Sequence, residues 1–143
     1  MKEYLDKLIS DIGYEEAARI LEGYSNQKRE EILTIVSNKG VHHLPDSLMR
    51  GEVVYASSGN LDFSSIDRVR EQYVDILKML SFELKKKKWD KVYVVPFGHT
   101  TLSMQIKQLV YRITRLETVD VFYSKEFGYR DLTIDQRALI VSE

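Results

Sequence analysis

The 143-residue sequence contains no cysteine. A disulfide framework, a thiol nucleophile and a thiolate metal site are therefore excluded, and the absence fits a reducing compartment. Long apolar runs are lacking as well: none approaches the roughly 20 residues that a membrane-spanning helix needs, and Met1–Asp6 lacks the apolar core of a signal peptide. We therefore expect a soluble, intracellular, cytoplasmic protein that has no membrane segment.

An excess of one charge is also absent. The sequence has 21 lysines and arginines against 22 acidic residues, which gives a net charge of −1. This balance provides no global basic field for nonspecific nucleic-acid binding, so any RNA contact has to come from a local patch. The apolar fraction of 43% and the charged fraction of 30% are those of an ordinary globular protein, long enough for one hydrophobic core.

Several common active-site motifs are missing. No Gly-x-Gly-x-x-Gly follows the first strand of the α/β part, and there is no Gly-Lys-Ser/Thr phosphate loop. No Gly-x-Ser-x-Gly elbow marks a hydrolase nucleophile. His42, His43 and Asp46 are metal-ligand types, but adjacent histidines point in different directions on a regular backbone and no further ligand converges on them. We therefore expect no metal and no cofactor.

Residues 1–40 carry helical patterns. A first helix ends at Gly13, a second ends near Tyr24, and Ser25 or Asn26 caps a third that ends near Gly40. Their apolar positions are Leu5, Leu8, Ile9, Ile12, Ala17, Ile20, Leu21, Tyr24, Ile32, Leu33, Ile35 and Val36. Three short helices resemble a helix-turn-helix unit, but their mixed charges leave no basic face. We expect a helical segment over residues 1–45 that packs on the remainder of the chain or on a protein partner.

From residue 46 onward, strand patterns alternate with helical ones. Strands are expected at 53–56, 92–95, 119–123 and 138–141, and helices at 66–84, capped by Ser64 or Ser65, and at 102–116. This order builds a parallel sheet through right-handed crossovers, with a last strand that can be antiparallel. The predicted fold class is α/β, a two- or three-layer βαβαβ-type sheet domain over residues 46–143 preceded by the small helical segment.

A candidate site lies where the second of these strands ends. The stretch Lys91–Thr101 passes from the apolar run Val92–Val95 to His99, Thr100 and Thr101, just before a helix. Ligands of open α/β sheets lie off the carboxyl ends of the strands, where a helix N-terminus offers free amide donors. His99 is therefore better placed for chemistry than the other two histidines, with a surface or capping role as the alternative interpretation.

Four consecutive lysines follow the helix expected at 66–84: Lys85, Lys86, Lys87 and Lys88. They lie where the helix dipole is negative, so a solvated C-terminal turn accounts for them. The alternative is a local patch that contacts phosphates, and the sequence shows no other obvious patch of this kind.

Two motifs give the second half of the chain a family resemblance. The first reads Pro96-Phe97-Gly98-His99-Thr100-Thr101 and the second Phe127-Gly128-Tyr129-Arg130-Asp131. Over about residues 52–141 the chain resembles the archaeal threonyl-tRNA synthetase editing domain, a relative of the D-aminoacyl-tRNA deacylases, which has Pro-Phe-Ala-His at a strand end and a later Pro-Phe-Gly-Tyr-Tyr-Lys. The lysine of that segment falls at Asp131 here, and the family's N-terminal strands have no counterpart among the expected elements.

The resemblance implies an aminoacyl-tRNA ester hydrolase of the editing type, which acts on the tRNA 3′ end with help from the substrate's own 2′-hydroxyl and an ordered water. His99 then orients substrate or water, and Thr100 and Thr101 hold the ester end. The implied substrate-binding residues are Phe97, Gly98, Ser57, Ser58, Tyr129 and Arg130, and the implied RNA contacts are Lys85, Lys86, Lys87 and Lys88.

A second hypothesis of a different class stays open. Asp131 at the lysine position would repel an RNA end, which is compatible with a catalytically degenerate module. Such a noncatalytic α/β module would bind a protein partner through residues 1–40 or hold a nucleotide-like ligand in its pocket. N-terminal helices without an internal partner are also compatible with a homodimer. Fold alone does not decide between these hypotheses.

Overall fold

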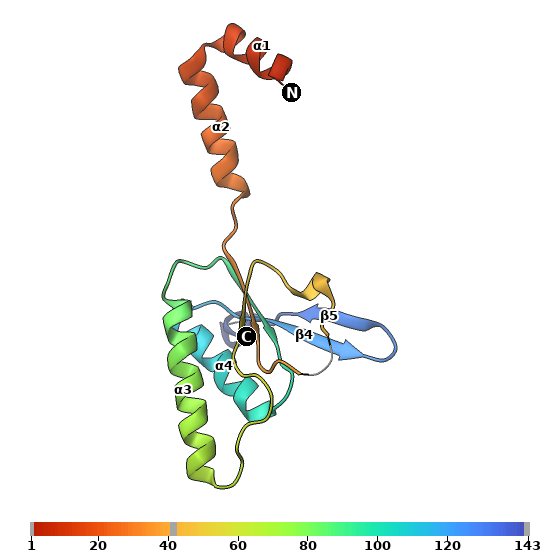
Figure 1. Cartoon of the computed structure of the whole chain (residues 1–143). Coiled ribbons are helices and arrows are strands. Elements are labelled where there is room, and N and C mark those ends of the chain that lie inside the picture. The colour runs from red at the N-terminus through yellow and green to blue at the C-terminus, as the bar shows by residue number, and fades with distance from the viewer. Residues whose placement is uncertain (1, 41–42, 142–143) are drawn as a thin grey trace. The chain divides into compact units, whose positions relative to one another are not determined.

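The computed structural model describes residues 2–40 and 43–141, and the chain divides into two compact units. The first unit, Met1–Glu30, holds two helices, α1 (Lys2–Ile12) and α2 (Tyr14–Lys28), drawn in red and orange in Figure 1. Between them Gly13 has φ 85°, a backbone conformation that favours glycine. The first two predicted helices are confirmed, and the second runs beyond Tyr24 to Lys28.

The second unit, Glu31–Glu143, is built on a five-stranded sheet with the strand order β2-β1-β3-β4-β5. The strands are β1 (Ile32–Val36), β2 (Glu52–Tyr55), β3 (Lys91–Val95), β4 (Val119–Ser124) and β5 (Gly128–Leu132). The first four strands run parallel, whereas β5 returns antiparallel to β4. The predicted α/β class is therefore confirmed.

The third predicted helix is wrong, because its apolar residues form β1 near the middle of the sheet. Leu33 and Ile35 belong to the core on one face of the sheet and Val36 to the core on the other, and all three are at most 1% exposed. A strand that is buried on both faces shows no polar–apolar alternation, so periodicity does not distinguish it from a buried helix. The sheet unit begins at Glu31, upstream of residue 46, where the pattern predicts the α/β part to begin.

Two helices, α3 (Ile66–Leu84) and α4 (Thr100–Thr114), lie side by side on one face of the sheet (Figure 1). Both helices confirm the predicted pattern. The core beneath them consists of Leu33, Ile35, Ala56, Leu80, Leu84, Trp89, Val92, Val94, Leu102, Ile106 and Val110. Within the described ranges no helix combines the length and the apolar character needed to cross a membrane.

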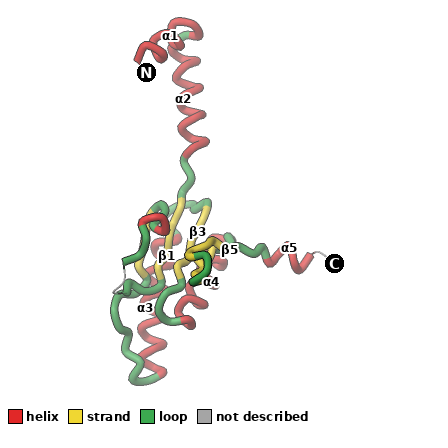
Figure 2. Tube along the Cα trace, turned by 90° about the vertical axis from the view of Figure 1, so that its right-hand side faces the viewer, coloured by secondary structure: helices red, strands yellow, loops and turns green. Residues whose placement is uncertain are grey.

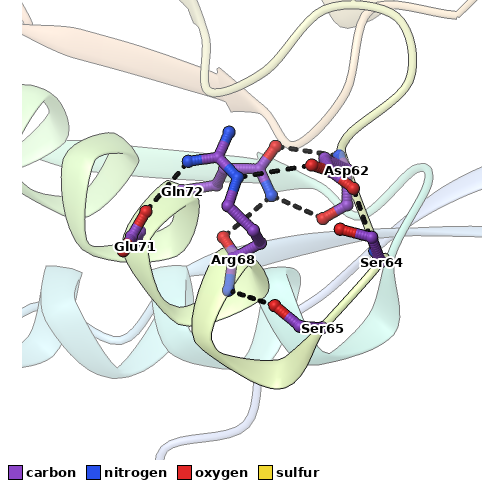
Figure 3. A network of polar contacts seen from close by, with 6 residues as sticks. All are labelled: Asp62, Ser64, Ser65, Arg68, Glu71 and Gln72. Carbon is purple, nitrogen blue, oxygen red and sulfur yellow. Dashed lines mark hydrogen bonds and ion pairs between the residues drawn. The ribbon is translucent and has the colours of Figure 1, made fainter.

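A polar network fixes the loop that leads into α3 (Figure 3). Ser65 Oγ accepts the backbone N–H of Arg68 at 3.1 Å, so the predicted cap is confirmed. Gln72 binds the backbone of Asp62 twice, by accepting its N–H at 2.9 Å and by donating to its carbonyl at 2.7 Å. The network is exposed, so it orders the loop more than it stabilises the fold.

The segment between β1 and β2 covers part of the opposite face of the sheet. It contains a short 3₁₀-helix, η1 (Asp46–Leu48), and its Leu44 and Leu48 pack on Val36, Val95 and Val121. Thr34 Oγ1, on the buried strand β1, donates to the Arg50 carbonyl at 2.6 Å and so closes the segment onto the sheet. This irregular cover is smaller than a helix and leaves room at the carboxyl ends of the strands.

The strand predicted at 138–141 is wrong: these residues belong to the helix α5 (Gln136–Val141), which stands away from the strands in Figure 2. Asp135 Oδ1 begins the helix by accepting the N–H groups of Arg137 at 3.1 Å and Ala138 at 3.4 Å. The antiparallel last strand is β5 instead. Its sequence, Gly-Tyr-Arg-Asp-Leu, is half polar, and its place in the sheet comes from the hairpin with β4.

Removal of residues 1–30 should leave the sheet unit folded, because its hydrophobic clusters contain no residue before Leu33. We expect residues 31–143 to unfold in one cooperative transition when circular dichroism is followed in urea. Removal of residues 1–40 also takes away β1, the strand between β2 and β3, and should abolish that transition. A cooperative transition in the shorter fragment would contradict the place of β1 in the core.

Candidate functional site

A cavity of about 550 Å³ lies at the carboxyl ends of β1, β2 and β3. Among the described residues its lining consists of Asn38, Lys39, Gly40, His43, Leu44, Met49, Tyr55, Phe97, Gly98 and Tyr129. The chain leaves β1 toward β2 on one side and leaves β3 toward β4 on the other, so the cavity lies at the switch point of the sheet. Open α/β sheets bind ligands at this point, and the volume is ordinary for a small-molecule site.

Asn38 is held at the edge of the cavity by buried hydroxyl groups. Ser57 Oγ lies 2.7 Å from the Ser37 carbonyl oxygen and 2.9 Å from Asn38 Oδ1, so its single hydroxyl proton is shared between these two acceptors. Ser103 Oγ, from the first turn of α4, donates to Ser37 Oγ at 2.8 Å. Because Ser57 holds the oxygen of the Asn38 carboxamide, its Nδ2 is the end left for a ligand. The cavity therefore gains a neutral hydrogen-bond donor at a defined position.

Gly98 brings the turn between β3 and α4 against Asn38. Its φ is 84°, and a Cβ at this position would lie 2.7 Å from Asn38 Cβ. Both the left-handed backbone conformation and the close approach require glycine here. The turn and the Asn38 side chain are thus matched to each other.

Aromatic rings and one lysine complete the cavity. Lys39 Nζ lies 5.3 Å from the centre of the Tyr55 ring, and the rings of Phe97 and Tyr129 meet edge to face at 6.2 Å. The described lining includes no carboxylate. Such a surface offers π faces and a cation together, which suits an anionic ligand that contains a ring.

The two motifs of the sequence meet at this cavity. Phe97 and Gly98 of the first motif and Tyr129 of the second all line it. Ser57 lies behind the described cavity lining, where its hydroxyl group is hydrogen-bonded to the Asn38 side chain. Ser58 forms an isolated backbone bridge with Lys39. The structure thus brings together part of the substrate-binding set that the sequence predicts.

The predicted catalytic residues lie on the neighbouring turn and are not part of the described lining. The His99 ring packs edge to face on Phe63 at 4.3 Å, and its side chain makes no cap bond to α4. Thr101 Oγ1 is hydrogen-bonded to the Tyr73 hydroxyl at 2.7 Å, and Thr100 is exposed at the first position of α4. The structure therefore does not bring these three side chains to the cavity.

Arg130 is also outside the described lining. Its guanidinium lies 5.6 Å from the Phe127 ring and donates to the Tyr129 carbonyl at 2.9 Å. On β5, Arg130 faces the opposite side of the sheet from its neighbour Tyr129, because successive side chains of a strand alternate.

The lysine run lies at the amino ends of the strands, opposite the cavity. Lys87 Nζ donates to Glu31 at 3.2 Å and to Glu52 at 2.8 Å, and these hydrogen bonds, that to Glu52 first, raise the pKa of Lys87. Lys86 pairs with Glu83 at 2.9 Å, whereas Lys85 and Lys88 are exposed. Lys87 thus ties the end of α3 to carboxylates at the start of the sheet, whereas the partner of Lys86 belongs to α3 itself.

A partly exposed ion pair, which no local sequence signal indicates, lies between the β1–β2 segment and β5. Arg50 donates to both carboxylate oxygens of Asp131, at 2.6 and 2.8 Å, and its guanidinium stacks on Tyr93 at 3.6 Å. The hydrogen bond from Arg50 lowers the pKa of Asp131, and the bond to Asp131 raises that of Arg50. The partners are 81 residues apart, so only the folded chain reveals the pair. It fixes the end of the β1–β2 segment to β5.

Metal ligands do not assemble in the described ranges, where no group of three or more His, Cys, Asp or Glu is placed to hold an ion. His43 Nε2 lies 3.9 Å from Asp46 Oδ1, and both side chains are almost fully exposed. His42, the third member of the cluster in the sequence, lies outside the described residues.

Comparison with known proteins identifies no relative. No family model matches the sequence, and searches of curated proteins and of solved structures find no match either. The resemblance to editing domains therefore rests on the two motifs and stays a prediction.

Gly98→Ala should destabilise the protein more than Gly59→Ala. Both glycines have positive φ, 84° and 76°, so each alanine pays a backbone cost of about 1 kcal/mol. A Cβ at Gly59 meets open space, whereas at Gly98 it meets Asn38. We expect a further loss of about 1–2 kcal/mol for Gly98→Ala, measured by urea unfolding. Equal losses would show that the contact with Asn38 relaxes without cost.

Asp131→Asn should cost about 1 kcal/mol at pH 7, since it leaves the half-buried Arg50 with a neutral partner and the carboxylate is partly exposed. The lowered pKa of Asp131 means that its stabilisation is present above the unfolded-state pKa of about 3.9 and is lost as the pH falls through the folded-state pKa. Urea unfolding at pH 7 and near pH 2.5 should therefore show a difference between wild type and variant that shrinks in acid.

The control for this measurement is Glu126→Gln, a change of an exposed carboxylate on the β4–β5 turn. It should alter the free energy of unfolding by less than about 0.5 kcal/mol at pH 7. A variant Asp131→Asn that matched this control would show that the Arg50 pair adds no stability.

Proposed function

We propose that this protein is an α/β module that binds a small anionic, nucleotide-like ligand in the cavity at the carboxyl ends of β1, β2 and β3. The observation that carries the proposal is the composition of the cavity. It combines aromatic rings, the cation of Lys39 and the free carboxamide nitrogen of Asn38 at the switch point of the sheet.

Each part of such a ligand has a matching group in the lining. A heterocyclic base fits against the aromatic side chains Tyr55, Phe97 and Tyr129, because every base offers a π face for stacking. A phosphate fits near Lys39, whose Nζ lies over the Tyr55 ring. The groups that would bind the base and the phosphate are therefore close to each other. The Asn38 donor then selects an oxygen or ring nitrogen of the ligand.

The positions of the histidines and hydroxyl groups favour ligand binding without hydrolysis. Hydrolysis needs a base within reach of the reacting water, and His43 is the one histidine in the described lining, where it is almost fully exposed. His99, Thr100 and Thr101 lie outside that lining. A ligand in the cavity is therefore held more by shape and charge than by catalytic groups.

A second candidate function is the editing-type aminoacyl-tRNA deacylase. The observation in its favour is that the Phe97–Gly98 turn and Tyr129, one from each motif, meet at the same cavity. The terminal adenosine of tRNA is itself a nucleotide-like ligand, so the two candidates share a binding mode and differ in chemistry. Under this candidate His99 has to turn from Phe63 toward the substrate.

The helical unit Met1–Glu30 remains the proposed binding site for a protein partner. Its exposed aromatic and aliphatic side chains include Tyr4, Tyr14, Ile20 and Leu21, each between 46% and 73% exposed. Exposed apolar side chains of this size are typical of a surface that binds another protein.

Calorimetric titration with AMP, GMP, CMP and UMP, and with the matching nucleosides, tests the proposal. We expect at least one nucleotide to bind and its nucleoside to bind more weakly, because the phosphate contact to Lys39 is lost. Lys39→Ala and Tyr55→Ala should each weaken binding about tenfold, or about 1.4 kcal/mol. The matched control, Lys125→Ala on the exposed β4–β5 turn, should bind as wild type does.

Absence of binding to every member of this panel at millimolar concentration would refute the proposal. A parallel assay of amino-acid release from mischarged tRNA separates the two candidates. Release that is lost in His99→Ala would support the deacylase, whereas nucleotide binding without release would support the binding module.

A further inference from the structure

The strand β2 ends the sheet on one side, and in the described part of the chain no strand pairs with its outer edge. The N–H of Ala56 donates to the Val36 carbonyl on β1 at 2.8 Å. Because backbone groups alternate along a strand, Val54 also directs its N–H and carbonyl toward β1, whereas Val53 and Tyr55 direct theirs outward. The outer edge therefore presents two residues whose outward donors and acceptors have no partner within residues 2–40 and 43–141.

This edge is self-complementary under a two-fold axis. An antiparallel copy centred on Val54 places Val54 opposite Val54 of the second chain and Val53 opposite Tyr55. Directly opposite residues of an antiparallel pair share one face, so this register is compatible with a continuous sheet. Val53 and Tyr55, which direct their backbone groups outward, then form two hydrogen-bonded pairs, four hydrogen bonds in all. Every side-chain pair at the centre of the contact is apolar.

We propose that two copies of this chain associate through β2 in this register, to form a ten-stranded sheet from two five-stranded ones. The exposed β-branched and aromatic side chains of the edge support this choice, since Val53 is 36% and Tyr55 37% exposed. Exposed apolar edge strands are the part of a sheet most prone to pair with another chain.

The opposite edge of the sheet is protected against the same contact. A two-fold pairing of the whole strand β5 centres on Arg130 and sets two guanidinium groups directly opposite each other. Like charges in that position are destabilising. Of the two edges, β2 is thus the one that fits a second copy.

The proposed contact between the two chains lies next to the candidate site. In the proposed register Val53 of the second chain lies beside Tyr55, which lines the cavity. A second copy therefore extends the wall against which the ring of a ligand packs. This part of the inference rests on the proposed ligand-binding function, whereas the association itself does not.

A single introduced cysteine tests the register, because the chain has no cysteine of its own. Two cysteines at position 54 would face each other as a non-hydrogen-bonded pair with Cα atoms about 4.5 Å apart, within the range for a disulfide. Full-length Val54→Cys should form a disulfide-linked dimer with copper–phenanthroline that dithiothreitol reverses. Arg130→Cys, at the centre of β5, should remain monomeric on a non-reducing gel.

Sedimentation of the full chain tests the association without a cross-link. Wild type should sediment as a dimer at about 100 µM, and Val53→Lys should shift it to monomer by placing two charges in the contact. The matched change on the other edge, Leu132→Lys, should leave the dimer intact. Circular dichroism confirms that each variant keeps its fold.

Wild type that sediments as a monomer at this concentration overturns the proposal, as does a dimer that resists Val53→Lys while Val54→Cys fails to cross-link. Nucleotide titration of Val53→Lys adds the test of the shared wall. A dimer that dissociates with at least threefold weaker ligand binding supports both parts. Dissociation with unchanged binding removes the shared wall and leaves the association, and a dimer that binds no nucleotide refutes the ligand proposal alone.

Discussion

Burial of β1 and β3 on both faces is the constraint on which the rest of the molecule depends. A parallel strand in the middle of a sheet has to be covered twice, and this chain uses two different covers. The helices α3 and α4 provide one, and the irregular segment from Leu44 to Arg50 provides the other. Because the second cover is short, it covers the middle of the sheet face and leaves the carboxyl ends of the strands uncovered. The cavity lies at these ends.

The polar groups at those strand ends follow from the same constraint. A backbone that leaves a buried strand still needs partners for its N–H and carbonyl groups. Ser57 supplies a hydroxyl to the Ser37 carbonyl, and Ser103 joins Ser37 to α4. Asn38 takes its orientation from this hydroxyl cluster, so a requirement of the fold places the donor that a ligand would meet. The site is thus a consequence of how the strand ends are satisfied.

Much of the fold can be predicted from the sequence, and the errors have physical reasons. The helices α3 and α4 have amphipathic stripes and a serine cap, which are local signals, and both are predicted. Strand β1 is mistaken for a helix because burial on both faces removes alternation, and α5 is mistaken for a strand because a short apolar run fits both periods. Strand β5 is half polar and is defined by its pairing with β4, which no pattern in its own residues reveals.

A residue of the candidate site can be predicted from the sequence only where the strand or turn that carries it is predicted. The turn after β3 is indicated by the proline and glycine that end an apolar run, and Phe97 and Gly98 do line the cavity. Asn38 and Lys39 are not found from the sequence, because the strand before Asn38 is assigned to a helix and its carboxyl end is therefore not recognised. Tyr55 lies in a strand that the sequence does predict, but the pattern does not indicate that its side chain lines a cavity. Side-chain direction is also not encoded locally: His99 follows Gly98 directly, yet its ring packs on Phe63.

Asp131 shows how a tertiary contact changes the meaning of a motif position. Considered in its motif alone, it replaces a cation with an anion and argues against any anionic ligand nearby. In the folded chain Arg50 holds both of its oxygens, and the pair as a whole is close to neutral. Asp131 therefore does not argue against an anionic ligand nearby. The lysine that the editing-domain motif has at this position is still absent. The charge at position 131 is thus compatible with the proposed anionic ligand.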